Sequence, residues 1–193
     1  MCKINNLTKA SASVEEAKSK QTEFSYSPCP IPSTLYVGML SKVMARDIIE
    51  NNRWNAFEEG HLGVLLLTKI ELAAGYACFN IDVAWLKGII LELDVYFREE
   101  DVVYVKDIKS DPNFQVYSRQ YESSSIPTTQ YALEVLGKRV LILNSGRTNS
   151  LYFVINPNKD CEYFTTDLVK VRRTYWKEEY WQLKTLQAKD KDD

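Results

Sequence analysis

The stretch "GIILELDVYFREEDVVYVKDI", residues 88 to 108, alternates apolar and polar side chains on both sides of a charged centre. Such alternation is typical of β-strands with one buried face. We therefore expect a β-hairpin with its loop at residues 99 to 101. The register that keeps the two faces apart places Asp94 opposite Lys106 on the polar face, whereas a slip by one residue would mix the faces.

Strand patterns on both sides of this stretch extend the expected sheet. "GVLLLTKIEL" precedes it and "AGYACFNIDVAWL" favours a buried strand, while "KRVLIL", "SLYFVI" and "EYFTTDLVKV" follow it. Turns rich in Asn, Gly and Pro separate the last three segments, so they predict a meander similar to part of a small SH3-like barrel. The polar segment 109–129 between the two groups is expected to be a long loop. The sequence predicts an antiparallel sheet of about five to seven strands.

Three helices are expected around this sheet, which makes the fold class α+β. Leu35, Met39 and Val43 follow a helical spacing and predict a helix over residues 34–52. A short helix near 128–136 is expected to end at a glycine. The third helix is the amphipathic C-terminal segment, residues 169–193.

The domain organisation follows from composition. Residues 1–33 are polar and carry the proline-rich "SPCPIPS", so they predict a flexible or partner-ordered N-terminal arm. Residues 34–168 are expected to form the core domain, and residues 169–193 a helix with a charged tail. At 193 residues the chain suits one domain.

Composition also limits the classes of function. The chain is 45% hydrophobic and 26% charged, without an apolar run of transmembrane length. No signal peptide is recognised at its start, so a cytoplasmic protein with no membrane partner is expected. Its four cysteines are scattered and its single histidine has no second histidine to join it, so no metal or other cofactor is expected. Between residues 47 and 136 acidic side chains outnumber basic ones by fifteen to seven, which hints at a charged partner or at contacts within the chain.

The segment "RRTYWKEEYWQLK", residues 172 to 184, concentrates aromatic and basic side chains. On a helix these residues would give an apolar stripe beside a positive face. The aromatic rings could cover the chain's own core, contact a protein partner or stack on nucleic acid bases. We interpret the segment as a partner-binding helix, with five candidate residues: Arg172, Arg173, Trp176, Tyr180 and Trp181.

A second constellation has the outline of a metal-dependent nuclease. Glu92 and Asp94 are two apart on a strand, so both carboxylates point to one face, with Asp82 upstream. Lys106 could supply the catalytic cation across the hairpin. An ordinary cross-strand ion pair between Asp94 and Lys106 explains the same pattern.

The sequence therefore favours a non-enzymatic interaction module, such as an adaptor, an inhibitor or an assembly component. It would bind another protein through the C-terminal helix and the N-terminal arm, and a small-molecule substrate is not expected. The alternatives are a nuclease or phosphodiesterase using Asp82, Glu92, Asp94 and Lys106, or a nucleic-acid-binding module without catalysis.

Overall fold

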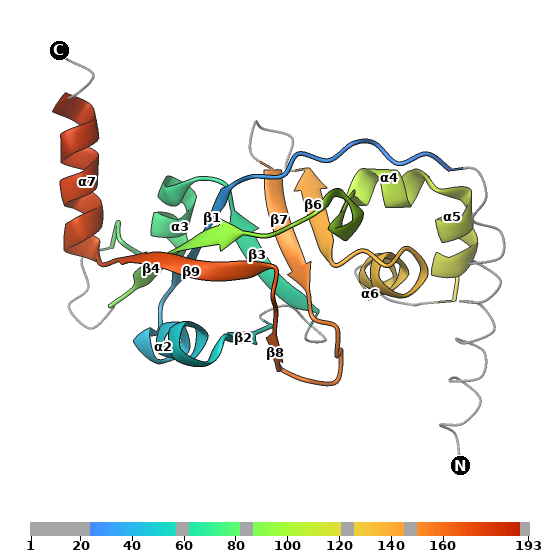
Figure 1. Ribbon diagram of the computed structural model, residues 1–193, viewed down its shortest axis with the longest axis horizontal. Helices are drawn as coiled ribbons and strands as arrows, with labels where there is room; N and C mark the ends of the chain where they lie inside the picture. Colours follow the sequence, from blue (N-terminus) through green and yellow to red (C-terminus); the bar gives the residue numbers. More distant parts are fainter. Residues whose placement is uncertain (1–23, 57–61, 82–86, 121–125, 145–149, 190–193) are drawn as a thin grey trace.

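The computed structural model describes residues 24–56, 62–81, 87–120, 126–144 and 150–189. These residues form the expected α+β fold around a mostly antiparallel sheet of seven strands (Figure 1). The strands in spatial order are β5 (Val102–Tyr104), β6 (Val140–Asn144), β7 (Ser150–Ile155), β3 (Gly63–Leu67), β1 (Thr34–Met39), β4 (Ile89–Val95) and β9 (Val169–Tyr175). A separate two-stranded ribbon pairs β2 (Arg53–Asn55) with β8 (Tyr163–Thr165).

Helices cover both faces of the sheet. The described helices are α2 (Lys42–Asn51), α3 (Ile70–Tyr76), α4 (Val105–Ser110), α5 (Pro112–Ser118), α6 (Ile126–Gln130), which continues into a π-helical turn (Tyr131–Val135), and α7 (Lys177–Lys189). In Figure 1, α2 and the β2–β8 ribbon lie below the sheet, α4 to α6 occupy one end of the molecule and α7 projects from the other. The helix expected near 128–136 is thus present.

Alternating side chains of the strands build hydrophobic clusters on the two faces. On one face Leu35, Leu66 and Leu91 pack with α2 and with Trp54 of the ribbon, whose side chain is 1% exposed. On the other face, α4 to α6 cover the β5–β6–β7 end and α3 covers the β1–β4 end together with the first turn of α7. The sheet ends at two edge strands, β5 and β9, of which β5 is largely buried.

The segment expected as one helix over residues 34–52 is a strand followed by a helix. Leu35 and Met39 are four apart, which suits a helix, but Val37 between them is also buried and the intervening side chains are not. The actual period is therefore two, and β1 lies between β3 and β4. The helix starts later, where the Ser41 hydroxyl accepts a hydrogen bond from Met44 N at 3.4 Å and caps α2.

The prediction of a hairpin over residues 88–108 is wrong. β4 pairs with β1 and β9, whereas β5 lies at the opposite edge in parallel with β6. The buried carboxylate of Asp101 explains the turn, because it accepts hydrogen bonds from Arg98 N at 3.0 Å and from Arg139 Nε at 3.0 Å. This pairing turns the chain toward β6, so the second half of the stretch never folds back on the first.

The C-terminal strands also take other partners than expected. β6 and β7 form an antiparallel pair, but β8 leaves the sheet for β2 and β9 joins β4 at the far edge. Nothing in the described sheet therefore supports the SH3-like arrangement. Residues 169–175, expected as the start of the C-terminal helix, form a strand, and α7 begins only at Lys177.

The described parts of the expected loop over residues 109–129 and of the N-terminal arm are more ordered than the sequence suggests. Within the described part of that loop, α5 and the start of α6 pack on the sheet. Residues 24–33, the described part of the arm, lie extended across the body (Figure 1). Tyr26 donates a hydrogen bond to the Asp111 carboxylate at 2.5 Å, and Tyr152 donates one to Pro30 O at 2.9 Å. The chain's own contacts therefore hold this part of the arm.

Candidate partner-binding surface at strand β9 and helix α7

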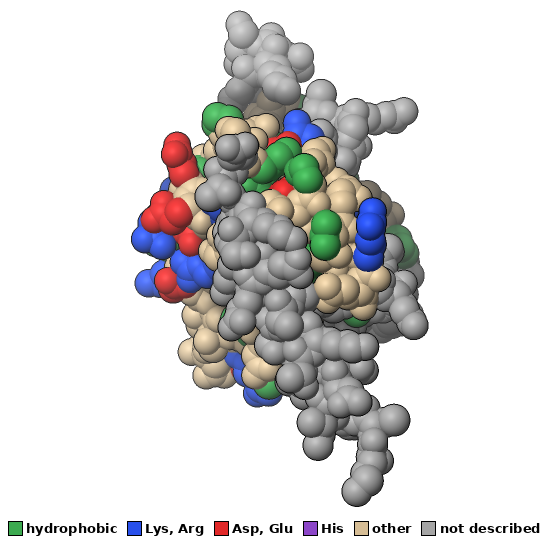
Figure 2. Space-filling view, turned by 90° about the vertical axis from the view of Figure 1, so that its right-hand side faces the viewer, with side chains coloured by type: hydrophobic (Ala, Val, Ile, Leu, Met, Phe, Trp, Pro, Cys, Tyr) green, Lys and Arg blue, Asp and Glu red, His purple; other side chains and the backbone are tan. Residues whose placement is uncertain are grey.

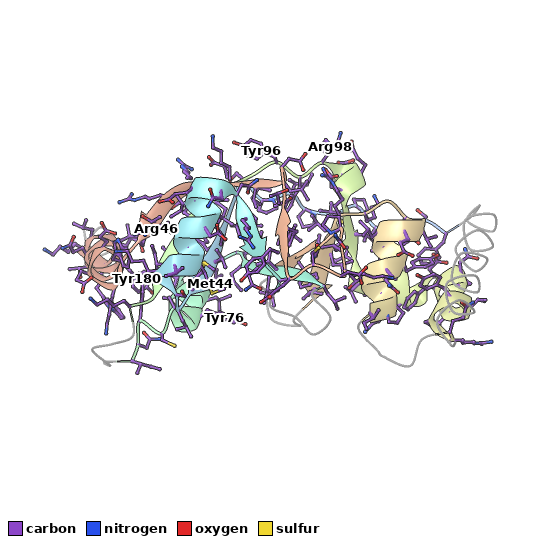
Figure 3. The ribbon with its side chains drawn as sticks, turned by 90° about the horizontal axis from the view of Figure 1, so that it is seen from below. Met44, Arg46, Tyr76, Tyr96, Arg98 and Tyr180 are labelled. Atoms are coloured by element: carbon purple, nitrogen blue, oxygen red, sulfur yellow. The ribbon has the colours of Figure 1, made fainter. Side chains whose placement is uncertain are left out.

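Helix α7 contacts the body mainly through its first turns. Tyr180 is buried there, with its ring 5.5 Å from that of Phe79, and it lies at the base of the helix where α7 meets the body (Figure 3). Lys184 Nζ donates to Glu71 Oε1 of α3 at 2.8 Å. Tyr180 is the one buried residue of α7, and Leu183 packs partly buried beside the same cluster, whereas residues 185–189 are exposed.

The start of α7 is fixed by local interactions. The Glu179 carboxylate accepts a hydrogen bond from Trp176 N at 2.9 Å, which satisfies one of the free amides at the helix N-terminus. Glu178 and Glu179 in the first turn also complement the positive end of the helix dipole. The two glutamates that interrupt the basic segment in the sequence therefore have a structural role.

The five predicted partner-binding residues fall into two groups. Arg172, Arg173 and Trp181 are exposed, and the exposed fraction of Trp181 is 44%. Tyr180, in contrast, is buried in the core. Trp176 is half-buried, with the Lys42 ammonium 5.2 Å from its ring centroid. The structure therefore brings the two arginines and Trp181 to the surface, and it gives Trp176 and Tyr180 packing contacts.

Strand β9 carries the arginines at one edge of the sheet. A β-bulge lies opposite Glu92 and Leu93, so that Arg172 is the extra residue in β9. Its guanidinium is 3.7 Å from the Glu92 carboxylate and 3.8 Å from that of Asp94. Arg173 lies over the ring of Tyr175 at 4.7 Å. Together with the exposed Lys170, these side chains make the edge positive.

Two carboxylates of the nuclease interpretation form ion pairs with an arginine of β9. Glu92 and Asp94 do share one face of β4, and both lie beside Arg172. The prediction that Lys106 lies beside these two carboxylates is wrong. Lys106 follows β5 at the opposite edge of the sheet, and its ammonium lies over the ring of Tyr104. Asp82 lies outside the described residues. Within the described ranges no group of three His, Cys, Asp or Glu side chains is close enough to hold a metal ion.

Glu92 also accepts a hydrogen bond from the hydroxyl of Tyr175. Burial, and then this hydrogen bond to a carboxylate, raises the pKa of Tyr175 to about 12. The pKa of Tyr175 is thus higher in the folded chain than in the unfolded chain, where it is about 10. Its contribution to the unfolding free energy is fully present below pH 10 and is lost as the pH rises through about 12.

We therefore predict a pH effect for Tyr175→Phe. Between pH 10 and 12 the wild-type chain should lose about 2 kcal/mol more unfolding free energy than the variant, which has no group to ionise at this site. Urea unfolding at several pH values, followed by circular dichroism, measures both curves. Parallel curves would show that Tyr175 does not couple to folding.

Charges at the other end of the molecule are arranged differently. Figure 2 faces the α5 end and shows acidic and basic side chains interleaved along one side. Elsewhere in the chain, Arg98 and Arg139 each form ion pairs shorter than 3.5 Å with two carboxylates. Lys170 and Arg173 of β9, in contrast, have no carboxylate within 4 Å among the described residues.

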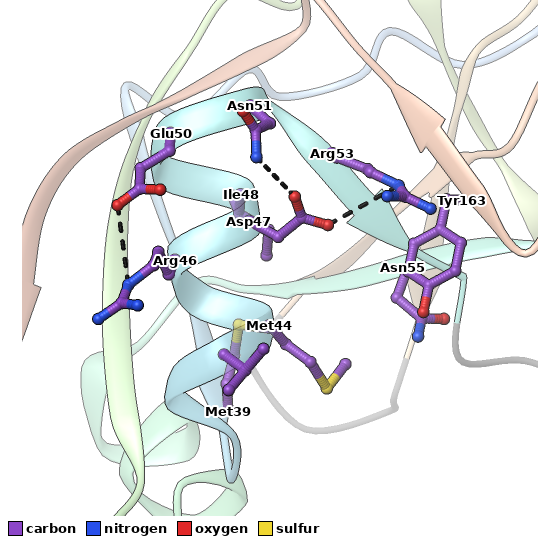
Figure 4. A pocket seen from close by; sticks show the side chains of 11 residues that line it. Met39, Met44, Arg46, Asp47, Ile48, Glu50, Asn51, Arg53, Asn55 and Tyr163 are labelled. Atoms are coloured by element: carbon purple, nitrogen blue, oxygen red, sulfur yellow. Dashed lines mark hydrogen bonds and ion pairs between the residues drawn. The ribbon is translucent and has the colours of Figure 1, made fainter.

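A pocket of about 240 Å³ lies between α2 and the β2–β8 ribbon (Figure 4). Its charged side chains already pair with one another: Arg46 is 3.7 Å from Glu50, and Arg53 is 3.7 Å from Asp47. Little charge is left for a ligand, so this pocket does not resemble a binding site for a charged molecule.

Another pocket, of about 440 Å³, opens between β1, α2 and β3. Val37, Met39, Met44, Val64 and Tyr76 are among the side chains that line it. No carboxylate, amine or imidazole occurs among the described lining residues. This pocket could hold an apolar group but offers no acid, base or nucleophile pair for catalysis.

A groove of about 700 Å³ runs along β9, and the sequence did not indicate it. Ile49 at the end of α2 and Tyr96 after β4 are 48% and 54% exposed, and both line this groove beside Val171. These residues come from distant segments, and each alone is an ordinary surface hydrophobic residue. Only the packing of α2 against the sheet brings them together.

Comparisons of this chain with protein-family models, with curated proteins and with solved structures find no significant match. None of the helices in the described part of the chain is long and apolar enough to cross a lipid bilayer. The class that the fold itself defines is an α+β domain with an open, positively charged sheet edge and a projecting C-terminal helix.

Proposed function

We propose that this protein is a protein-interaction module that binds its partner at the β9–α7 surface, defined as Lys170, Arg172, Arg173, Trp181 and Leu186. The observation that supports it most is the projection of α7. Trp181 and Leu186 are 44% and 61% exposed on a helix whose one buried residue is Tyr180.

Helix energetics favour a partner for α7. An isolated helix shorter than about 15 residues is marginally stable in water, and α7 has 13 residues with few contacts to the body. Trp181 and Leu186 are five residues apart, so they lie on different sides of the helix and flank the packed Tyr180. A partner that covers them would bury apolar surface and stabilise the outer turns of α7.

The double variant Trp181→Ser/Leu186→Ser tests this function. The full-length tagged chain is crosslinked in its source cell, and the captured polypeptides are quantified by mass spectrometry. We expect at least one polypeptide to fall about tenfold in the variant, which corresponds to the loss of about 1.4 kcal/mol of binding free energy. Trp176 is left intact because its half-buried ring contacts the core.

A matched control separates binding from general surface polarity. Val43→Ser/Val116→Ser changes two hydrophobic residues that are 76% and 51% exposed on α2 and α5. This control should retain the polypeptides that the α7 variant loses, and circular dichroism should show both variants folded. If both variants capture the same polypeptides as the wild type, α7 is not the binding surface.

A further inference from the structure

Strand β9 is an edge strand with an open backbone side. It pairs with β4 on one side only. Tyr96 N donates to Leu168 O at 2.8 Å just before the strand, and bonded pairs alternate along an antiparallel ladder. By this alternation, Lys170 bonds to β4, whereas the amide and carbonyl groups of Val169 and Val171 point away from β4. Val169 is only 2% exposed, so its backbone is already covered, and Val171 offers the accessible amide and carbonyl. An extended peptide could therefore pair with β9 without breaking a bond of the existing sheet.

The side chains of β9 define the charge of a suitable peptide. Lys170, Arg172 and Arg173 are exposed along this strand of seven residues. Arg172 makes only long ion pairs, at 3.7 and 3.8 Å, and the other two have no carboxylate within 4 Å among the residues described. Acidic side chains on an added strand would find these cations across the pair, and opposite charges in that position are stabilising.

The groove beside β9 defines the other face of such a peptide. Ile49, Tyr96 and Val171 line it together with Lys170, Arg172 and Arg173, so apolar and positive side chains border the same groove, and Val169 and Val171 also pack toward the core. Successive side chains of a strand point to opposite faces. A peptide that alternates acidic and apolar residues would thus direct its carboxylates to the cations and its apolar side chains toward Ile49 and Val171.

A second copy of this chain is a poor occupant of the same edge. If two β9 strands paired antiparallel with their centre anywhere between Val171 and Arg173, two cations would lie opposite each other in every register. Like charges directly opposite destabilise a strand pair, and natural edge strands use charges and bulges to prevent self-association. The edge rejects its own copy and favours an acidic strand.

From these observations we infer that β9 accepts an extended segment of alternating acidic and apolar residues from a partner protein, as an eighth strand of the sheet. The inference rests on the proposed function and names the chemistry of the partner. It depends on the edge of β9, whereas the proposed function depends on the exposed side chains of α7.

The probe is a fluorescently labelled peptide of alternating Glu and Val, with the seven-residue length of β9. Fluorescence anisotropy with the full chain should show saturable binding that weakens as salt is raised. A peptide of alternating Lys and Val should bind at least about tenfold more weakly, because it meets the cations with like charge. A Glu–Val peptide N-methylated on the residue that would pair with Val171 should lose binding too, since strand addition needs that amide.

Matched protein variants locate the site. Lys170→Gln/Arg173→Gln should weaken binding of the Glu–Val peptide about tenfold, whereas Lys109→Gln/Lys159→Gln, which removes two exposed cations elsewhere, should not. Hydrogen exchange should show slower exchange at the amide of Val171 when the peptide is bound. Unchanged exchange there, equal binding of the Lys–Val peptide, or no binding of the Glu–Val peptide would overturn the strand-addition proposal.

The two proposals fail separately. If the peptide does not bind but capture still depends on Trp181 and Leu186, strand addition is wrong and the α7 surface stands. If the peptide binds at β9 but capture is unchanged in Trp181→Ser/Leu186→Ser, strand addition stands and the α7 surface is wrong. Dimers of the free chain, seen by sedimentation at increasing concentration and strengthened by Lys170→Gln/Arg173→Gln, would assign the edge to a second copy and overturn the acidic partner.

Discussion

Replacing Asp111 by alanine should lower the unfolding free energy by about 4 kcal/mol. The Asp111 side chain is fully buried and accepts hydrogen bonds from the hydroxyls of Tyr26 at 2.5 Å and Tyr131 at 2.7 Å. Its other oxygen accepts from Asn113 N at 2.8 Å and caps α5. Alanine would remove the buried acceptor that two hydroxyls share, together with the side-chain cap of a helix amide. Urea denaturation followed by circular dichroism measures the loss.

Two further variants identify the cause. Asp107→Ala removes an acceptor for Ser27 N on the same N-terminal segment, but this bond is exposed, so the cost should be about 0.5 kcal/mol. In a Tyr26→Phe background, Asp111→Ala should cost less than in the wild type, because one donor is already gone. If Asp111→Ala and Asp107→Ala cost the same, the buried cluster does not hold the N-terminal segment.

Gly38→Ala should destabilise the fold by about 3 kcal/mol. A Cβ atom at Gly38 would lie 1.9 Å from Ala73 O, which is a backbone atom of α3. Gly88 at the start of β4 faces Ala77 O at the same distance. The two glycines let the backbone of α3 rest directly on β1 and β4, so a methyl group at either one must push the helix away from the sheet. Thermal and urea unfolding measure the effect.

Gly75→Ala is the matched control for this prediction. Gly75 lies in α3 itself, and a Cβ atom there would meet nothing within 4 Å. Because alanine restricts the unfolded chain and favours helix, this variant should be neutral or more stable by up to about 1 kcal/mol. A Gly38→Ala variant as stable as Gly75→Ala would mean that α3 does not pack at this distance.

These two sites also bear on the binding experiments. Asp111 fixes the end of the molecule formed by α4 to α6, and Gly38 fixes α3 against the middle of the sheet. Neither belongs to the β9–α7 surface. Substitutions of exposed side chains at that surface are expected to cost less than about 1 kcal/mol of stability, so a change in binding there can be separated from unfolding.

The candidate surface was only partly predictable. Residues 172–184 were recognised as unusual because basic and aromatic residues concentrate there, and the structure does place Arg172, Arg173 and Trp181 on the surface. The segment was wrongly expected to be helical throughout, because Val169, Trp176 and Tyr180 also fit a helical spacing. Pairing with β4 overrides that spacing up to Tyr175, and only then does a helix begin.

The sequence by itself determined the fold class, the number of strands within the expected range and the faces of most strands. Alternation of apolar residues suffices for this, because it records which side chains leave water. Only the tertiary structure decided which strands are neighbours. Contacts between distant residues, such as Asp101 with Arg139 and Gly38 with α3, select among pairings that a period of two leaves equally open. That selection places β9 at an edge and thereby creates the surface proposed to bind a partner.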